Sequence, residues 1–209
     1  MFKSAEKFGN YQGNQFAYRE TPKFKNAVHE LEQFDELGNQ NRIVILATAL
    51  DLKPASLIGI KITDNEVRHR LERILSDLGV FFQENPAPHD SSVSHIVIGG
   101  TPETIATAIE NTRAGATDEQ FGSAMGFPDT AIDSYSNDNV FDDSLSKDLV
   151  LSQDEMRKKL TAEERKFSFF RFSKGHYEKE VEWIEQIAAA TKEYAPILYE
   201  KIMSRSDGW

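Results

Sequence analysis

The chain has 209 residues, a net charge of −10 and 39% hydrophobic residues. This length is enough to bury a substantial core, and no stretch reaches the roughly 18 consecutive apolar residues that a membrane span needs. The sequence contains no cysteine, which excludes disulfides, thiolate metal sites and cysteine nucleophiles. The first residues have no apolar region of the kind found in secretory signals, so we expect a cytoplasmic protein without membrane contact.

The negative charge is concentrated in one region of the sequence. Residues 117–155 hold ten acidic side chains and a single basic one, Lys147, whereas the rest of the chain holds 24 acidic and 23 basic side chains. Such a region repels nucleic-acid phosphates and attracts basic proteins or cations. We therefore expect a protein partner with a basic surface rather than nucleic acid; a solvated loop region is the alternative interpretation. The residues that would form this acidic surface are Asp138, Asp142, Asp143 and Asp148.

The N-terminal part of the chain predicts an arm, a helix and two strands. Residues 1–22 mix Gly, Asn and Gln with aromatic residues without a clear period, which is typical of an irregular arm. Pro22 suits the start of a helix, and Gly38 suits its end. The runs at 42–50 and 57–62 are rich in β-branched residues and predict the first two strands.

A second helix and two further strands are expected next. Asp64 is a suitable N-cap for the clearest helical pattern in the chain, and Gly79 is a suitable stop. The apolar residues between them recur at helical spacing. Short strands are expected at 80–83 and 95–98, and Pro102 then begins another helix after a threonine cap.

The predicted order of elements is therefore β-β-α-β-β-α, an α+β fold with a mixed or antiparallel sheet and helices on one face. We expect this two-layer sheet domain to cover residues 23–115. Residues 116–209 predict a mainly helical region packed on the same body, with an acidic linker at 137–148. Its longest helix is expected from residue 177 to about residue 194, with a kink or restart at Pro196.

The segment 121–135, with the sequence FGSAMGFPDTAIDSY, predicts two short helices joined by a sharp corner. Gly122 and Gly126 are four residues apart, so on a helix they would lie on one face and permit close backbone contact. Phe127 precedes a proline and cannot continue the helix, whereas Pro128 suits the first turn of the next one.

The same segment resembles one in a family of uncharacterised prokaryotic proteins, where an Ile-Val-Ile-Gly-like strand precedes the pattern Gly-x-Leu-Leu-Gly-Tyr-Pro-x-Cys-Cys-Val. The paired cysteines of that pattern are replaced here by Thr130 and Ala131, so no redox, metal or nucleophilic role of the thiols transfers. The family has no activity to carry over, and the resemblance implies the corner alone. The matching residues are Gly122, Gly126, Phe127, Pro128 and Ile132, with the upstream strand at 96–99.

Few residues combine in a way that predicts chemistry. A histidine, an acid and two serines share one loop at 89–92, either as a polar surface loop or as part of a site. No EF-hand pattern fits the acidic residues at 133–148, and nothing predicts a metal or a cofactor. A binding pocket between the sheet edge and the corner at residues 126–128 would use the candidates His89, Asp90, His95, Phe127, Thr130 and Asp133.

The run KFSFFRF at 166–172 interleaves aromatic and basic side chains, as do strands on which RNA-binding modules stack bases. It lacks the glycine of such strands, and the charge of the chain opposes nucleic acid. A core strand or an aromatic helix face is the favoured interpretation of this run.

These observations lead to a non-enzymatic binding or protein-interaction module with an acidic face. The alternative is a small-ligand-binding protein or an enzyme, with its pocket near the corner at residues 126–128. A homo-oligomer built through the C-terminal helix and residues 167–172 is a further hypothesis.

Overall fold

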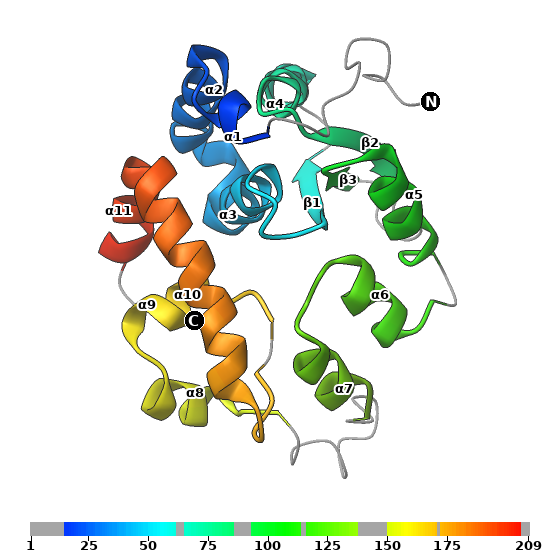
Figure 1. The fold of residues 1–209 in the computed structure, drawn as a ribbon, viewed down its shortest axis with the longest axis vertical. Coiled ribbons are helices and arrows are strands. Elements are labelled where there is room, and N and C mark those ends of the chain that lie inside the picture. The colour runs from blue at the N-terminus through cyan, green and yellow to red at the C-terminus, as the bar shows by residue number, and fades with distance from the viewer. Residues whose placement is uncertain are drawn as a thin grey trace. The chain divides into compact units, whose positions relative to one another are not determined.

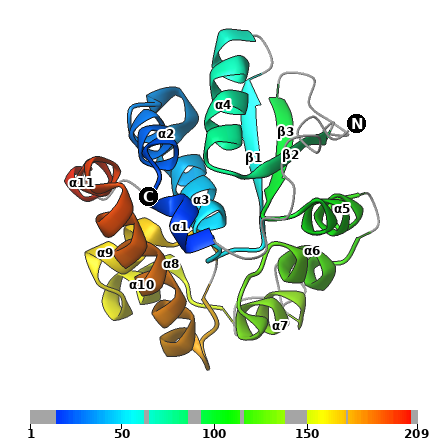
Figure 2. The same cartoon turned by 45° about the horizontal axis from the view of Figure 1, so that its top comes forward.

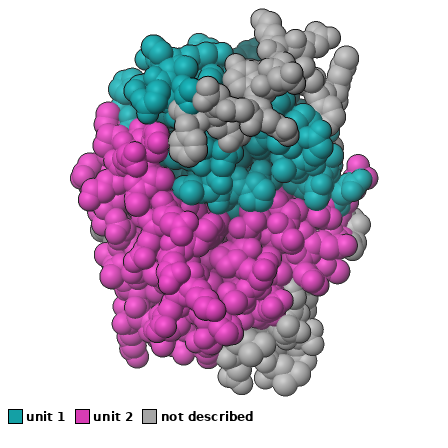
Figure 3. Space-filling view, viewed as in Figure 1, with its two compact units in different colours: residues 1–110 teal, residues 111–209 magenta. Residues whose placement is uncertain are grey.

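The computed structural model describes residues 15–61, 65–85, 93–113, 116–137, 150–170 and 172–205. It divides into two compact units, residues 1–110 and 111–209, which are coloured separately in Figure 3. The fold is mixed α+β, with one small antiparallel sheet among helices (Figure 1). In the described part of the chain, no helix is both long and apolar enough to cross a membrane.

Unit 1 contains helices and the three strands of the sheet. Its described elements are α1 (Gln15–Arg19), α2 (Pro22–Glu32), a 3-10 helix (Asp35–Leu37), α3 (Gly38–Ala49), β1 (Ala55–Lys61), α4 (Asn65–Asp77), β2 (Phe81–Asn85), β3 (Val93–Gly99) and α5 (Pro102–Glu110). The strands predicted at 57–62, 80–83 and 95–98 are confirmed, as are the helix that ends before Gly79 and the helix from Pro102. Helix α1 lies in the described part of the expected irregular arm.

The sheet has β3 at its centre, with β1 and β2 on either side in antiparallel register. Ser56 lies opposite Ile98, so both side chains point to one face of the sheet, and Gly99 belongs to the other face. The Ser56 hydroxyl is 2.9 Å from the Thr48 hydroxyl of α3. A Cβ on Gly99 would lie only 2.7 Å from the Thr104 hydroxyl of α5. Helices therefore cover both faces, as Figure 2 shows, and the predicted layout with helices on one face is wrong.

The strand predicted at 42–50 is also wrong, because these residues belong to α3. Every residue from Arg42 to Thr48 is buried, so the run has no polar face from which a helical period could be recognised. A short, β-branched apolar run looks the same in a buried strand and in a fully buried helix. The observed sheet consequently has three strands in the described residues instead of the predicted four.

The helix predicted from Pro22 ends earlier than Gly38. Helix α2 stops at Glu32, and the 3-10 helix follows. Gly38 has a φ of +69° and begins α3, so the glycine reverses the chain between two helices rather than ending one long helix. The buried Arg42 guanidinium holds this turn together, donating at 2.8 Å both to the Glu32 carbonyl and to the Asp35 carboxylate.

In the described residues of unit 2, the regular elements are all helices, apart from an isolated bridge between Val150 and Ser173. Its elements are α6 (Asp118–Ala124), α7 (Asp129–Asn137), α8 (Gln153–Lys159), α9 (Ala162–Phe167), α10 (Tyr177–Tyr194) and α11 (Pro196–Ser204). The long helix from residue 177 and its restart at Pro196 are confirmed. The expected acidic linker at 137–148 lies beyond the described residues from position 138 onward.

Candidate functional site

The corner at residues 126–128 joins α6 and α7 into a helical hairpin, as the sequence predicts. Gly126 has a φ of +67°, a left-handed conformation that glycine adopts without strain. The Phe127 backbone N–H then donates to the Gly122 carbonyl at 3.0 Å. Gly122 faces Ile132 of α7 so closely that an added Cβ would lie 2.8 Å from Ile132 Cγ1. Both glycines are therefore needed by the geometry of the hairpin.

Helix α7 is fastened to α10 through the carboxylate of Glu180. This side chain is fully buried, at 0% exposure, and it accepts three hydrogen bonds. The Thr130 hydroxyl donates at 2.7 Å, the Ser173 hydroxyl at 2.6 Å and the Ser173 backbone N–H at 2.7 Å. A buried carboxylate costs free energy unless its oxygens are satisfied, and these donors satisfy both of them. Glu180 therefore fixes α7 and the turn before α10 in one arrangement.

A cluster of aromatic rings lies in the same unit. The Phe127 ring lies 6.3 Å from Phe121, 6.3 Å from Phe169 and 5.8 Å from Phe170, measured between centroids. The Trp183 ring of α10 lies 5.4 Å from Phe169 and 5.6 Å from Phe170. All five side chains are half-buried. We call these residues, Phe121, Phe127, Phe169, Phe170 and Trp183, the aromatic cluster.

In its described residues, the run at 166–172 forms neither the core strand nor the aromatic helix face that its sequence suggests. Helix α9 ends at Phe167, and the described residues after it follow an irregular path into the cluster. Phe167 and Phe172 are fully buried, and Phe167 stacks on Tyr199 at 5.8 Å. The expected role in core packing is therefore confirmed for these two residues.

The α6–α7 hairpin carries acidic side chains on its outer surface. Asp118 and Glu119 are exposed in the first turn of α6, and Asp129 is exposed in the first turn of α7, where carboxylates stabilise the helix dipole. Asp133 is exposed one turn further along α7. We call Asp118, Glu119, Asp129 and Asp133 the hairpin acids.

The predicted site residues of unit 2 have different partners in the structure. Phe127 and Thr130 both lie at the start of α7, but the first contacts the aromatic cluster and the second binds Glu180. His95 is a half-buried residue of β3 in unit 1. His89 and Asp90 lie outside the described residues, as do Asp138, Asp142, Asp143 and Asp148. The predicted pocket therefore stays a prediction.

Glu180 is not among the residues predicted from the sequence, although its position in the sequence holds a signal. One face of α10 is buried at positions spaced by three or four residues, as expected for a helix. These positions are Glu180, Ile184, Ile187 and Thr191. A charged residue in such a stripe must find hydrogen-bond donors inside the fold. The sequence therefore indicates that Glu180 has buried hydrogen-bond donors. It does not identify them, because Thr130 approaches Glu180 only in the tertiary structure.

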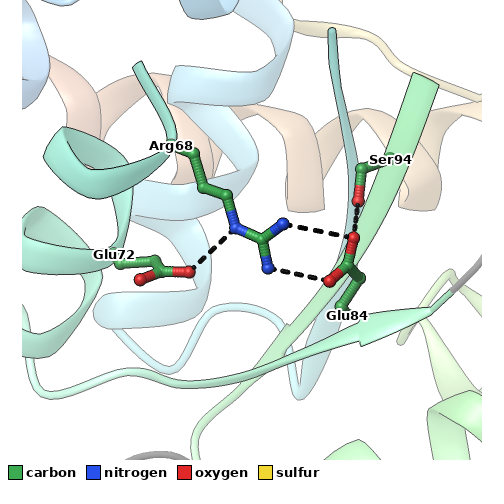
Figure 4. A network of polar contacts seen from close by, with 4 residues as sticks. All are labelled: Arg68, Glu72, Glu84 and Ser94. Atoms are coloured by element: carbon green, nitrogen blue, oxygen red, sulfur yellow. Dashed lines mark hydrogen bonds and ion pairs between the residues drawn. The ribbon is translucent and has the colours of Figure 1, made fainter. Parts of the chain in front are cut away.

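A second polar network lies in unit 1, between α4 and the sheet (Figure 4). The Arg68 guanidinium donates to Glu84 of β2 at 2.7 Å and to Glu72 of α4 at 3.1 Å. The Ser94 hydroxyl of β3 donates to the same Glu84 carboxylate at 2.5 Å. Hydrogen bonds to Glu84 and then to Glu72 raise the pKa of Arg68 above its ordinary value. The network joins one helix to two strands and therefore holds α4 on the sheet.

Lys53 is the most strongly perturbed lysine among the described residues. It lies in the turn between α3 and β1 with 3% of its surface exposed, and burial lowers its pKa to about 7. Asp51, two residues earlier, has a φ of +58° and accepts a hydrogen bond from Arg19 at 2.6 Å. The charge of Lys53 therefore changes near neutral pH, and its neutral amine is the form that acts as a base or nucleophile.

Comparisons with protein-family models, curated proteins and solved structures give no match to this chain. The resemblance of residues 121–135 to a prokaryotic family therefore stays a prediction. Among the described residues, no group of three or more His, Asp or Glu side chains is placed to hold a metal ion.

Proposed function

We propose that this chain is a non-enzymatic protein-interaction module whose α6–α7 hairpin binds a protein with a basic surface, with the cytoplasm as its expected location. The observation that carries the proposal is the display of four exposed acids on one hairpin. No basic residue lies between Arg113 and Lys147 in the sequence, so the hairpin has no positive charge of its own.

The rigidity of the hairpin supports this function. Gly122 lies against Ile132, and Thr130 is bound to the buried Glu180, so the carboxylates are carried on helices with fixed positions in unit 2. A charged surface that is already ordered loses little conformational entropy when it binds. Its main contribution is to steer association and to select partners of opposite charge.

The expected affinity is modest and depends on salt. An exposed ion pair contributes about 0.2–1 kcal/mol, so four pairs contribute on the order of 1–4 kcal/mol at low salt. Charges separated by more than about 10 Å are screened at an ionic strength of about 0.1 M. Binding through this surface should therefore weaken as salt is added.

A pair of charge-matched variants tests the proposal. Asp118→Asn, Glu119→Gln, Asp129→Asn and Asp133→Asn together remove the hairpin acids. The control removes the same charge from exposed positions of α10 and α11: Glu182→Gln, Glu185→Gln, Glu193→Gln and Glu200→Gln. A third variant neutralises the predicted acidic surface Asp138, Asp142, Asp143 and Asp148.

The readout is the binding of each full-length variant to an arginine-rich and to a lysine-rich peptide, with basic proteins captured from the host as a second measurement. We expect loss of binding in the hairpin variant and retention in the α10–α11 control, with circular dichroism confirming that both keep their helices. The proposal would lose its basis if the hairpin variant and the variant at residues 138, 142, 143 and 148 both bound the peptides as tightly as the wild type. An equal loss in the hairpin variant and the control would mean that net charge, and not the hairpin, attracts the peptides.

A further inference from the structure

The aromatic cluster of unit 2 leaves part of five large rings at the surface. Other aromatic residues of this chain, among them Phe24, Phe34, Phe167 and Phe172, are buried to 1% exposure or less. The five rings of the cluster are each half-buried although they contact one another. Neighbouring aromatic residues that remain partly exposed are typical of binding surfaces.

Two of the hairpin acids, Asp118 and Asp129, lie within three residues of a ring of this cluster along the chain. Asp118 and Phe121 are three residues apart on α6, so they lie on the same side of the helix. Asp129 follows Phe127 by two residues at the start of α7. Exposed carboxylates and partly exposed rings are thus carried by the same short segment. A ligand that satisfies both must carry positive charge on a group that also stacks.

The arginine side chain has this combination of properties. Its planar guanidinium stacks on aromatic rings by cation–π attraction and still donates hydrogen bonds to a carboxylate in its own plane. A lysine ammonium is more strongly hydrated and cannot form the paired hydrogen bonds of the guanidinium. The chemistry of the surface therefore selects arginine over lysine.

We propose that the aromatic cluster and the hairpin acids together form a docking surface for an arginine-bearing segment of the basic partner protein. This inference rests on the proposed function and adds the chemistry of recognition. The partner would place a guanidinium against Phe121 or Phe127 and pair it with Asp118 or Asp129. Long-range attraction would come from the remaining acids.

Tryptophan fluorescence gives a direct measurement, because the chain contains only two tryptophans and one of them, Trp183, belongs to the cluster. In a Trp209→Phe background, Trp183 alone reports on binding. The probes are an arginine-rich peptide and a peptide of the same sequence with lysine at every arginine. We expect a saturable change in Trp183 emission and a tighter dissociation constant for the arginine peptide, by about two- to fivefold.

Substitutions within the cluster identify the surface. Phe121→Leu and Phe127→Leu keep an apolar side chain but remove the aromatic ring. Each should make the dissociation constants for the arginine and lysine peptides equal. Tyr177→Leu is the matched control, because Tyr177 is a half-buried aromatic residue of the same unit that stacks with Lys159. Thermal unfolding of each variant verifies that the fold is retained, and Phe169→Leu provides a second cluster variant if one fails to fold.

Two results would overturn this inference, and they differ in what they leave standing. Equal affinity of the wild-type chain for the arginine and lysine peptides would remove the docking role of the aromatic cluster and leave the acidic hairpin as a charge-based binding surface. Failure of the wild-type chain to bind either peptide would remove both proposals. An arginine preference that survives in both phenylalanine variants would place recognition elsewhere and also overturn the inference.

Discussion

Replacing the buried Lys53 with methionine should stabilise the protein most strongly at and below neutral pH. Burial lowers the pKa of this lysine from 10.5 in the unfolded chain to about 7 in the folded chain. Between these two values the unfolded chain binds a proton that the folded chain does not, so stability rises with pH across this window. Below the folded pKa both states are protonated and the full cost of the buried charge is present. Above the unfolded pKa that cost is absent.

The size of the effect follows from the two pKa values. The difference between 10.5 and about 7 corresponds to about 5 kcal/mol, at about 1.36 kcal/mol for each pH unit. This figure is a ceiling, because relaxation and water entry around a buried charge reduce its real cost. Methionine has a similar unbranched side chain and should fill the space that the lysine stem occupies, at a cost of less than about 1.5 kcal/mol.

Urea unfolding at a series of pH values across this window measures the prediction. The free energy of unfolding of Lys53→Met minus that of wild type should be largest near the folded pKa and should shrink toward the unfolded one. Lys25→Met is the control, because Lys25 is exposed and pairs with Glu20 at 2.7 Å. A difference that stays constant with pH, or one that Lys25→Met reproduces, would refute the assignment of a buried lysine with a lowered pKa.

Three further substitutions test the contacts that shape the two units. Thr130→Val should destabilise the protein by about 1–3 kcal/mol in urea unfolding, because Glu180 loses one donor while remaining buried; an unchanged stability would contradict a stabilising role of the Thr130–Glu180 hydrogen bond. Gly122→Ala should cost about 1–3 kcal/mol by forcing a Cβ against Ile132, and Ile132→Ala in the same chain should reduce the penalty of the alanine. Arg68→Met should cost on the order of 1 kcal/mol at low salt and less at high salt, because its ion pairs are partly exposed; a penalty that salt does not change would contradict an ionic origin.

Elements with one polar and one apolar face could be predicted from the sequence. In α4, Leu71, Ile74 and Leu75 are buried at helical spacing while the residues between them include charged ones, so the helical period is visible in the sequence. The expected N-cap, Asp64, lies outside the described residues. The corner after α6 could also be predicted, because Gly126 tolerates the φ of +67° and the proline that follows Phe127 prevents the helix from continuing. In these segments the chain's own sequence decides the conformation.

Helix α3 and the turn at Gly38 could not be predicted in the same way. In α3 the surrounding elements bury every side of the helix from Arg42 to Thr48, so the sequence loses the alternation that would distinguish helix from strand. The prediction that Gly38 ends a helix was wrong for a related reason, because a glycine with positive φ can precede a helix as well as follow one. Both errors arise where tertiary contacts, rather than local preference, choose the conformation.

Glu180 connects the folding of unit 2 with its proposed binding surface. Its carboxylate binds Ser173 just before α10 and Thr130 in the first turn of α7, so it ties together two segments that also supply the aromatic cluster. If the bond to Thr130 were lost, α7 would keep its contact at Gly122 but could shift against α10. We expect Phe127 then to shift relative to Trp183, which would alter the proposed docking surface. An interior glutamate can thus control a surface that it does not itself touch.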